Sequence, residues 1–361
     1  MCCPGLCPRT YVHEFVLSSH WVVHQQFFLH LEPAVLESNL MSEVLMYRQA
    51  VYAVNTKKSY RTHGRVYHRF CDILQIAPVP LGNNHLCMFA AYLARFLLPS
   101  SVCQYLNYVG LIHKENGYPN PLLDNWVFSS VIKGIKRIHG VAPKPKLPIS
   151  IDILYLIHSR LNLSNSKHAS FWAICLVSFF GLFRKSHLLP ISHKDFDPAQ
   201  FLLRSDFSFC KDVILVLVRW SKTIQLGQRT VTIPLVGIPD SCLCPLSAIR
   251  QAFFLTPSAQ PMSQAFCYRD SSLCQNVTFT YKAFLGCLHH VLRELGIPLS
   301  DYACHSFRRR GATYALEAGV PLDHIAVMGD WKSDAMYLYL HMPLRQRLQA
   351  QRTITSSLTN S

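Results

Sequence analysis

The sequence predicts a mainly α-helical protein with a small antiparallel β-sheet, divided into a helical N-terminal domain and a mixed C-terminal domain. Three observations favour this fold class. From residue 43 to 139, apolar residues recur at helical spacing with basic residues between them. Three prolines then interrupt the chain within residues 143–148. Two β-branched runs, 213–220 and 229–235, follow within an otherwise helical second half.

The helical domain is expected over residues 43–140, after a leader (1–42) whose order the sequence does not determine. One helix is expected to begin near Thr56, with this residue as its N-cap. The remaining helices are expected at 85–98, 100–116 and 125–139. Together they form a compact bundle with basic faces, and the basic residues near the start of the first helix are Lys57, Lys58 and Arg61.

A linker is expected at residues 141–149, because its prolines cannot continue a helix and favour an extended, fairly stiff chain. Its two lysines, Lys144 and Lys146, are placed to contact phosphates. The second domain is expected over 150–350, followed by a polar tail at 351–361. In this domain the two β-branched runs form a hairpin with its turn at residues 225–228, and helices are expected at 150–162, 167–180, 245–254, 280–295, 305–318 and 322–328.

The composition of the chain indicates which kind of molecule it binds. The chain has 35 Lys and Arg against 20 Asp and Glu, a formal net charge of +15. An excess of this size favours a polyanion, most commonly nucleic acid. The fourteen cysteines are scattered singly in apolar stretches, which predicts buried free thiols in a reducing compartment and no metal site. Since no apolar run is long enough to cross a bilayer, we expect no membrane span.

A few polar residues suit chemistry on a phosphodiester, which requires fixed cations, a nucleophile and a proton donor. His305 and Arg308 lie three apart on an expected helix and so share a face, and Gly311 allows close backbone approach. Taken singly, such residues are more often solvated or structural. The other candidates are Arg184 after an apolar helix, Lys222 at the hairpin tip, Trp331 as an N–H donor, and the phenols Tyr337 and Tyr339.

Together these motifs resemble the tyrosine recombinases (integrases), and most closely those of DIRS-type and Ngaro-type retrotransposons. The resemblance covers about residues 146–348, and the helical domain before it resembles the family's SAM-like core-binding domain. It is carried by the sequences Gly181-Leu182-Phe183-Arg184-Lys185-Ser186, Arg219-Trp220-Ser221-Lys222-Thr223-Ile224-Gln225, Cys244-Pro245-Leu246, His305-Ser306-Phe307-Arg308-Arg309-Arg310-Gly311-Ala312-Thr313 and Gly329-Asp330-Trp331-Lys332-Ser333-Asp334-Ala335.

The resemblance implies DNA cleavage and rejoining through a 3′-phosphotyrosyl bond, in support of DNA recombination or integration of a mobile element. It implies a nuclear protein that acts on double-stranded DNA as a homotetramer and requires neither cofactor nor metal. The implied catalytic residues are Arg184, Lys222, His305, Arg308, Trp331 and the nucleophile Tyr339. The DNA-binding residues expected from charge and position are Lys57, Lys58, Arg61, Lys144, Lys146 and Arg309.

The sequence departs from the family pattern at two positions. Tyr339 follows Trp331 by eight residues, where relatives usually have nine, and Tyr337 therefore stays an alternative nucleophile. His187 stands three residues after Arg184, where relatives often have an acidic residue that supports this arginine. Three other functions stay open: a DNA-binding protein that has kept the fold but no longer cuts, a type IB topoisomerase, and a zinc-binding regulatory protein.

Overall fold

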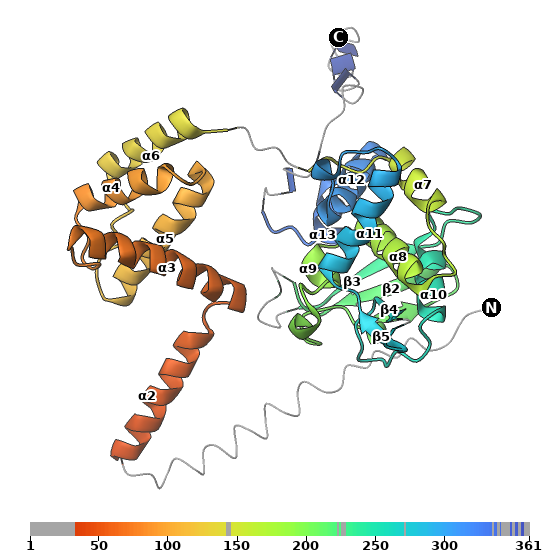
Figure 1. The fold of residues 1–361 in the computed structure, drawn as a ribbon, viewed down its shortest axis with the longest axis horizontal. Coiled ribbons are helices and arrows are strands. Elements are labelled where there is room, and N and C mark those ends of the chain that lie inside the picture. The colour runs from red at the N-terminus through yellow and green to blue at the C-terminus, as the bar shows by residue number, and fades with distance from the viewer. Residues whose placement is uncertain are drawn as a thin grey trace. The chain divides into compact units, whose positions relative to one another are not determined.

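The predicted fold class is confirmed by the structure, a computed structural model. It describes residues 33–141, 146–221, 224, 229–270, 272–333, 336–337, 340, 347–348, 351–352 and 355–356. In this part of the chain most residues are helical, and the strands form two small antiparallel sheets. The chain divides into two compact units, residues 1–143 and 144–361 (Figure 1). The division falls within the segment expected to be a linker.

The regular secondary structure of unit 1 is helical throughout its described residues. Its helices are α2 (Pro33–Ala50), α3 (Val54–Leu74), α4 (Asn83–Ala94), α5 (Pro99–Glu115) and α6 (Trp126–His139). Helix α2 runs across position 42, where the sequence analysis ended the leader. Helix α3 begins before Thr56, and its N-cap is Ala53, whose carbonyl accepts a hydrogen bond from the amide of Lys57 at 3.0 Å. The predicted Thr56 cap was therefore wrong.

The core of unit 1 forms where α3 packs on α4 and α5. Tyr67 of α3 is fully buried, and its ring packs edge-on against Phe89 with centroids 5.1 Å apart. Its hydroxyl donates a 2.6 Å hydrogen bond to the carbonyl of Pro78, so the buried phenol keeps a polar partner. Gly64 approaches the Tyr108 ring so closely that a Cβ there would overlap it. This packing leaves the basic residues of α3 on the exposed face.

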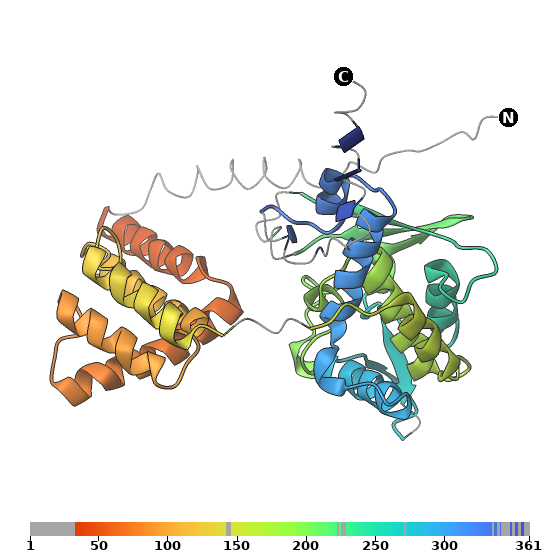
Figure 2. The same ribbon diagram turned by 90° about the horizontal axis from the view of Figure 1, so that it is seen from above.

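Unit 2 is built around one buried helix, α8 (Ser166–Phe180), in which every residue from Ala169 to Phe179 is buried. A helix that is apolar on all sides has to be surrounded, and α8 contacts α10 (Pro245–Phe254), α11 (Tyr281–Glu294) and α12 (Cys304–Glu317) (Figures 1 and 2). The remaining helices of the unit are α7 (Ile151–Ser159), α9 (Lys185–Leu188) and α13 (Leu322–Met328).

The main sheet has the order β1 (Phe207–Phe209), β2 (Val213–Val218), β3 (Val231–Val236), with antiparallel pairing throughout. In β2 the residues Ile214, Val216 and Val218 are buried and alternate with partly exposed ones, as expected for a strand with one face on the core. The predicted pairing of the two β-branched runs is confirmed. The sequence analysis missed β1 and a second hairpin, β4 (Cys267–Asp270) with β5 (Gln275–Thr278).

The last residues of the predicted linker belong to unit 2. The amide of Leu147 donates to the carbonyl of Asp301 at 2.7 Å, and the amide of Ile149 donates to the carbonyl of Ser306 at 3.2 Å. Ile149 is fully buried. The extended chain is therefore fixed to unit 2 from about residue 147, which corrects the expectation of a linker through 149. Lys144 lies outside the described residues.

The described cysteines are free thiols. Cys71, Cys175 and Cys304 are buried as predicted, whereas Cys210 and Cys274 are exposed. No helix among the described residues combines the length and apolar character needed to cross a membrane. Nor do three or more His, Cys, Asp or Glu side chains gather there as the ligands of a metal ion would.

Candidate active site

Three segments that are far apart in sequence meet in unit 2. The first follows α8 and contains Leu182 and Arg184, the second is α12 with Arg308, and the third follows α13 with Gly329 and Trp331. Arg308 joins all three, because its guanidinium donates to the carbonyl of Leu182 and, at 2.7 Å, to the carbonyl of Gly329. Four of the six predicted catalytic residues lie in these segments.

Arg308 is fully buried, although arginine is rarely so. The ring of Trp331 covers its guanidinium, with 3.8 Å between the guanidinium carbon and the ring centroid. A cation over an indole face is attracted by the ring's quadrupole, most strongly where water is excluded. Two of the predicted catalytic residues, Arg308 and Trp331, are thus in direct contact, with the indole lying over the arginine.

Two glycines permit this arrangement. Gly311 faces α8, where an added Cβ would overlap the backbone carbonyl of Phe179, so α12 approaches α8 more closely than a larger residue allows. This agrees with the close approach predicted at Gly311. Gly329 lies against the Trp331 ring, and a Cβ there would overlap the indole. Small residues at both positions therefore bring Arg308 and Trp331 together.

Arg184 lies at the mouth of this cluster, with 14% of its side chain exposed. It is the N-cap residue of the short helix α9. Its Nη2 donates to the backbone carbonyl of Asp330 at 2.9 Å, and its Nη1 lies 3.4 Å from Asp330 Oδ2. Arg184 is therefore held by the residue next to Trp331.

Asp330 is a site residue that the sequence analysis missed. Its carboxylate is 7% exposed and accepts hydrogen bonds from Ser221 Oγ at 2.5 Å and from Arg229 Nη2 at 2.8 Å, in addition to Arg184. Its backbone is left-handed (φ 50°), a conformation that Asp and Asn tolerate better than most residues. Asp330 lies in the Gly329-Asp330-Trp331 motif that the sequence analysis singled out. Nothing in the neighbouring sequence, however, indicates that its carboxylate bonds to residues 221 and 229.

His187 is the residue that stands where relatives often have an acid to support Arg184. The imidazole is 4% exposed, and among the described residues neither ring nitrogen has a hydrogen-bond partner. Burial, with Arg184 and Arg308 nearby, lowers the pKa of His187 to about 3. The ring is therefore neutral at physiological pH, and the carboxylate that holds Arg184 comes instead from Asp330.

His305 lies in the first turn of α12, one turn before Arg308, and part of its surface is exposed. Partial burial of the ring and the cations Arg308, Lys185 and Arg184 lower the pKa of His305 to about 4. Its imidazole is consequently neutral near pH 7, and a neutral imidazole can accept a proton. Lys185 itself lies over the ring of Tyr281, 4.2 Å from the centroid.

The two remaining predicted catalytic residues, Lys222 and Tyr339, lie outside the described residues. Their described neighbours are informative. Ser221, directly before Lys222, is fully buried, and its carbonyl accepts a 3.1 Å hydrogen bond from the amide of Ile224. Tyr337, the alternative nucleophile, is 57% exposed.

The predicted DNA-binding residues fall into two groups. Lys57, Lys58 and Arg61 are exposed on α3 of unit 1. In unit 2, the ammonium of Lys146 donates to the carbonyl of Ser300, while Arg309 donates to the carbonyl of Lys146 at 3.3 Å. Lys146 and Arg309 therefore also attach the first residues of unit 2 to the rest of that unit.

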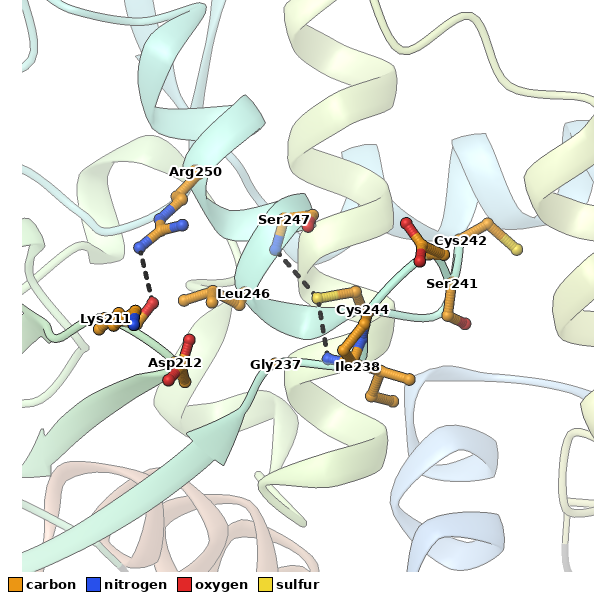
Figure 3. Close-up of a pocket in the computed structure, with 12 residues that line it drawn as sticks. Lys211, Asp212, Gly237, Ile238, Ser241, Cys242, Cys244, Leu246, Ser247 and Arg250 are labelled. Atoms are coloured by element: carbon orange, nitrogen blue, oxygen red, sulfur yellow. Dashed lines mark hydrogen bonds between the residues drawn. The ribbon is translucent and has the colours of Figure 1, made fainter.

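A separate hollow of about 550 Å³ lies between the end of β3 and the start of α10 (Figure 3). Cys244 borders it, and the Cys244 sulfur accepts hydrogen bonds from the amides of Ile238 at 3.2 Å and Ser247 at 3.5 Å. Burial alone would raise the pKa of this thiol, but hydrogen bonds from the side chain of Ser247 and from the backbone of Ile238, Ser247 and Leu246 outweigh burial and lower the pKa. None of the predicted site residues lines this hollow.

The chain has a sequence relative that matches it over most of its length. No protein-family model matches the chain. The chain is 22% identical over 286 residues to the integrase/recombinase xerD homolog of Selenomonas ruminantium, and the match covers 76% of this chain and 77% of that protein. A shorter match, 32% identical over 154 residues, is to sarcospan of Homo sapiens; it covers 39% of this chain and 56% of that protein.

Solved structures share the fold over most of the chain. The integrase of transposon Tn1549, in complex with transposon right end DNA, aligns with 87% of this chain and 98% of its own, with a TM-score of 0.58 and 14% identity. A lambda integrase dimer bound to a core site aligns with 84% of this chain and 95% of its own, with a TM-score of 0.54 and 12% identity. The chain therefore has the fold of the tyrosine recombinases, and the xerD homolog supports that family.

Proposed function

We propose that this protein cleaves and rejoins DNA strands as a tyrosine recombinase, and that it serves the recombination or integration of a DIRS-type or Ngaro-type mobile element. The observation that carries the proposal is the cluster of Arg184, Arg308 and Trp331, assembled from three distant segments within an integrase fold. Arginine suits this task because its planar fork can bond two phosphate oxygens and stays charged.

The first chemical step transfers one phosphodiester from DNA to the protein. The phenol oxygen of Tyr339 attacks phosphorus, the bond to the 5′ oxygen breaks, and Lys222 protonates that leaving oxygen. His305, neutral near pH 7, accepts the phenol proton. The product is a 3′-phosphotyrosyl bond and a free 5′ hydroxyl. A second strand's 5′ hydroxyl then reverses the chemistry, so bond energy is conserved and no external energy source is required.

The burial of Arg308 adds a requirement to this mechanism. Arg184 is partly exposed and meets an entering phosphate first. Arg308 lies beneath the indole, so its contact with the phosphate requires Trp331 to turn aside. In that position the indole N–H is available to a phosphate oxygen. Binding of DNA and assembly of the two-arginine pocket are thereby coupled.

The proposal extends to partners and location. The Tn1549 and lambda integrases were solved with DNA, and the net charge of +15 on this chain suits the same partner. Since exchange between two duplexes cuts four strands, we propose a homotetramer assembled on double-stranded DNA. We further propose a nuclear location, where such a substrate is found.

The burial of Arg308 also favours one alternative, a protein that binds DNA through this fold without cutting it. A strand-transfer assay on circles carrying candidate terminal repeats separates the two. Recombined products that require Arg184, and disappear in Arg184→Ala, support the proposed function. Salt-sensitive binding with no strand transfer and no covalent adduct supports the alternative, and relaxation of supercoiled plasmid by monomers indicates topoisomerase activity instead.

A further inference from the structure

The carboxylate of Asp330 connects two parts of unit 2 that are distant in sequence. On one side it meets Arg184, whose Nη1 lies 3.4 Å from Oδ2. On the other it accepts from Ser221 Oγ and from Arg229 Nη2, the latter at 2.8 Å. Ser221 and Arg229 flank the tip of the β2–β3 hairpin, so both ends of the tip are bonded to the same carboxylate.

The first end of the tip is the more firmly fixed. Ser221 is fully buried and Ile224 is 2% exposed, and the amide of Ile224 donates to the carbonyl of Ser221 at 3.1 Å. Lys222 follows Ser221 directly in the sequence, and consecutive Cα atoms are about 3.8 Å apart. Whatever anchors Ser221 therefore limits where the Lys222 side chain begins.

We propose that Asp330 is a positioning residue, whose carboxylate holds both ends of the hairpin tip against Arg184 and thereby sets the position of Lys222 relative to the scissile phosphate. This inference rests on the proposed function and deepens it, since it assigns the placement of the proton donor to a residue that makes none of the bonds to DNA. Ser221 and Arg229 act as the hairpin's contacts to this carboxylate.

Asp330→Asn is the matched variant for a test. Asparagine has the same shape and tolerates the left-handed backbone at this position, but it lacks the charge that holds Arg184 and Arg229. Ser221→Ala is a milder variant that removes one hydrogen bond and leaves all charges in place. Thermal melting of each variant establishes that it is folded before cleavage is measured.

The experiment compares two DNA substrates, one with the natural oxygen and one with sulfur at the bridging 5′ position of the scissile phosphate. A thiol is far more acidic than an alcohol, so a thiolate leaves without a proton donor. Lys222→Ala should lose about 100-fold or more in cleavage of the natural substrate and regain near wild-type cleavage on sulfur. Arg308→Lys should lose cleavage on both, because sulfur does not replace a missing bond to the phosphate.

The inference predicts that Asp330→Asn follows the lysine variant. Its cleavage of the natural substrate should fall by about 10-fold to 100-fold, with a clearly smaller loss on the sulfur substrate, where only the weakened support of Arg184 remains. Ser221→Ala leaves all charges in place, so its smaller loss should recover to near wild-type on the sulfur substrate. An equal loss on both substrates would place Asp330 in support of Arg184 alone and overturn the inference, as would no loss at all. Wild-type protein that cleaves neither substrate would contradict the proposed function and the inference with it.

Discussion

The indole of Trp331 lies over the guanidinium of Arg308 at 3.8 Å, although the two residues come from separate segments. Backbone carbonyls of Leu182 and Gly329 accept hydrogen bonds from the same guanidinium. A buried charge is costly unless it is paired or hydrogen-bonded, and these bonds offset that cost. The Trp331 indole therefore both stabilises the buried Arg308 side chain and covers the guanidinium that would bind phosphate.

Replacement of Trp331 by alanine tests this coupling. Trp331→Ala should lower the free energy of unfolding by about 2–3 kcal/mol, since it removes both the packing of the indole and its cation–π interaction. Trp331→Phe keeps an aromatic face over Arg308 and should be destabilised by less than half as much. Urea titrations of the two variants measure the difference. An equal decrease in both would mean that the ring's face over Arg308 contributes nothing.

The packing of α12 on α8 depends on Gly311. Gly311→Ala should destabilise unit 2 by about 1–3 kcal/mol, because the new methyl group meets the carbonyl of Phe179. The control is Gly286→Ala in α11, where an added Cβ meets nothing within 4 Å. That variant should gain about 0.5–1 kcal/mol from helix propensity. Thermal melting of both variants measures these changes. An unchanged melting temperature in Gly311→Ala would count against the close approach of α12 to α8.

His187 predicts how stability depends on pH. Its folded pKa is about 3, whereas an unfolded histidine titrates near 6.5, so the unfolded state binds more protons between these values. Stability should therefore fall as pH drops from about 6.5 towards 3, with a contribution from this residue of up to about 1.4 kcal/mol per pH unit. Urea titrations between pH 7 and 4.5 should show a shallower fall in His187→Asn. The same slope in both proteins would show that His187 is not buried in neutral form.

The exposed basic face of α3 predicts the salt dependence of DNA binding. Replacing Lys57, Lys58 and Arg61 by alanine should make the slope of log K against log salt less steep by about 0.9 for each DNA phosphate that the variant no longer neutralises. Fluorescence anisotropy with duplex DNA between 50 and about 200 mM salt measures that slope. Lys211→Ala, which removes an exposed cation that is not among the predicted DNA-binding residues, should leave it unchanged. An unaltered slope in the triple variant would remove α3 from the interface.

Long periodic segments could be predicted closely from the sequence. Helix α10 has the predicted bounds, Pro245–Phe254, and α6 begins after Asn125, whose side chain caps the amide of Phe128 at 3.0 Å. The β2–β3 pairing followed from two β-branched runs. These features are local, because spacing, caps and turn residues within one segment decide them.

The missed features depend on interactions between segments. Strand β1 has three residues, and β4 and β5 contain polar residues such as Arg269 and Asn276, so neither carries a clear apolar alternation. Asp330 became a site residue only through Arg184, Ser221 and Arg229, which lie more than a hundred residues away along the chain. The resemblance indicated that His187 stands where relatives often have an acidic residue, but the compensating carboxylate could be found only in the folded structure.

The proposed function requires that a tyrosine beside this arginine pocket becomes covalently joined to DNA. A suicide substrate releases the short fragment that carries the free 5′ hydroxyl after cleavage, and so traps the intermediate. It measures this directly when the protein–DNA adduct is resolved on a denaturing gel. We expect an adduct with the wild-type protein and with Tyr337→Phe, and none with Tyr339→Phe. An adduct of undiminished yield in Tyr339→Phe would contradict the assignment of the nucleophile, and no adduct from the wild-type protein would contradict the proposed function itself.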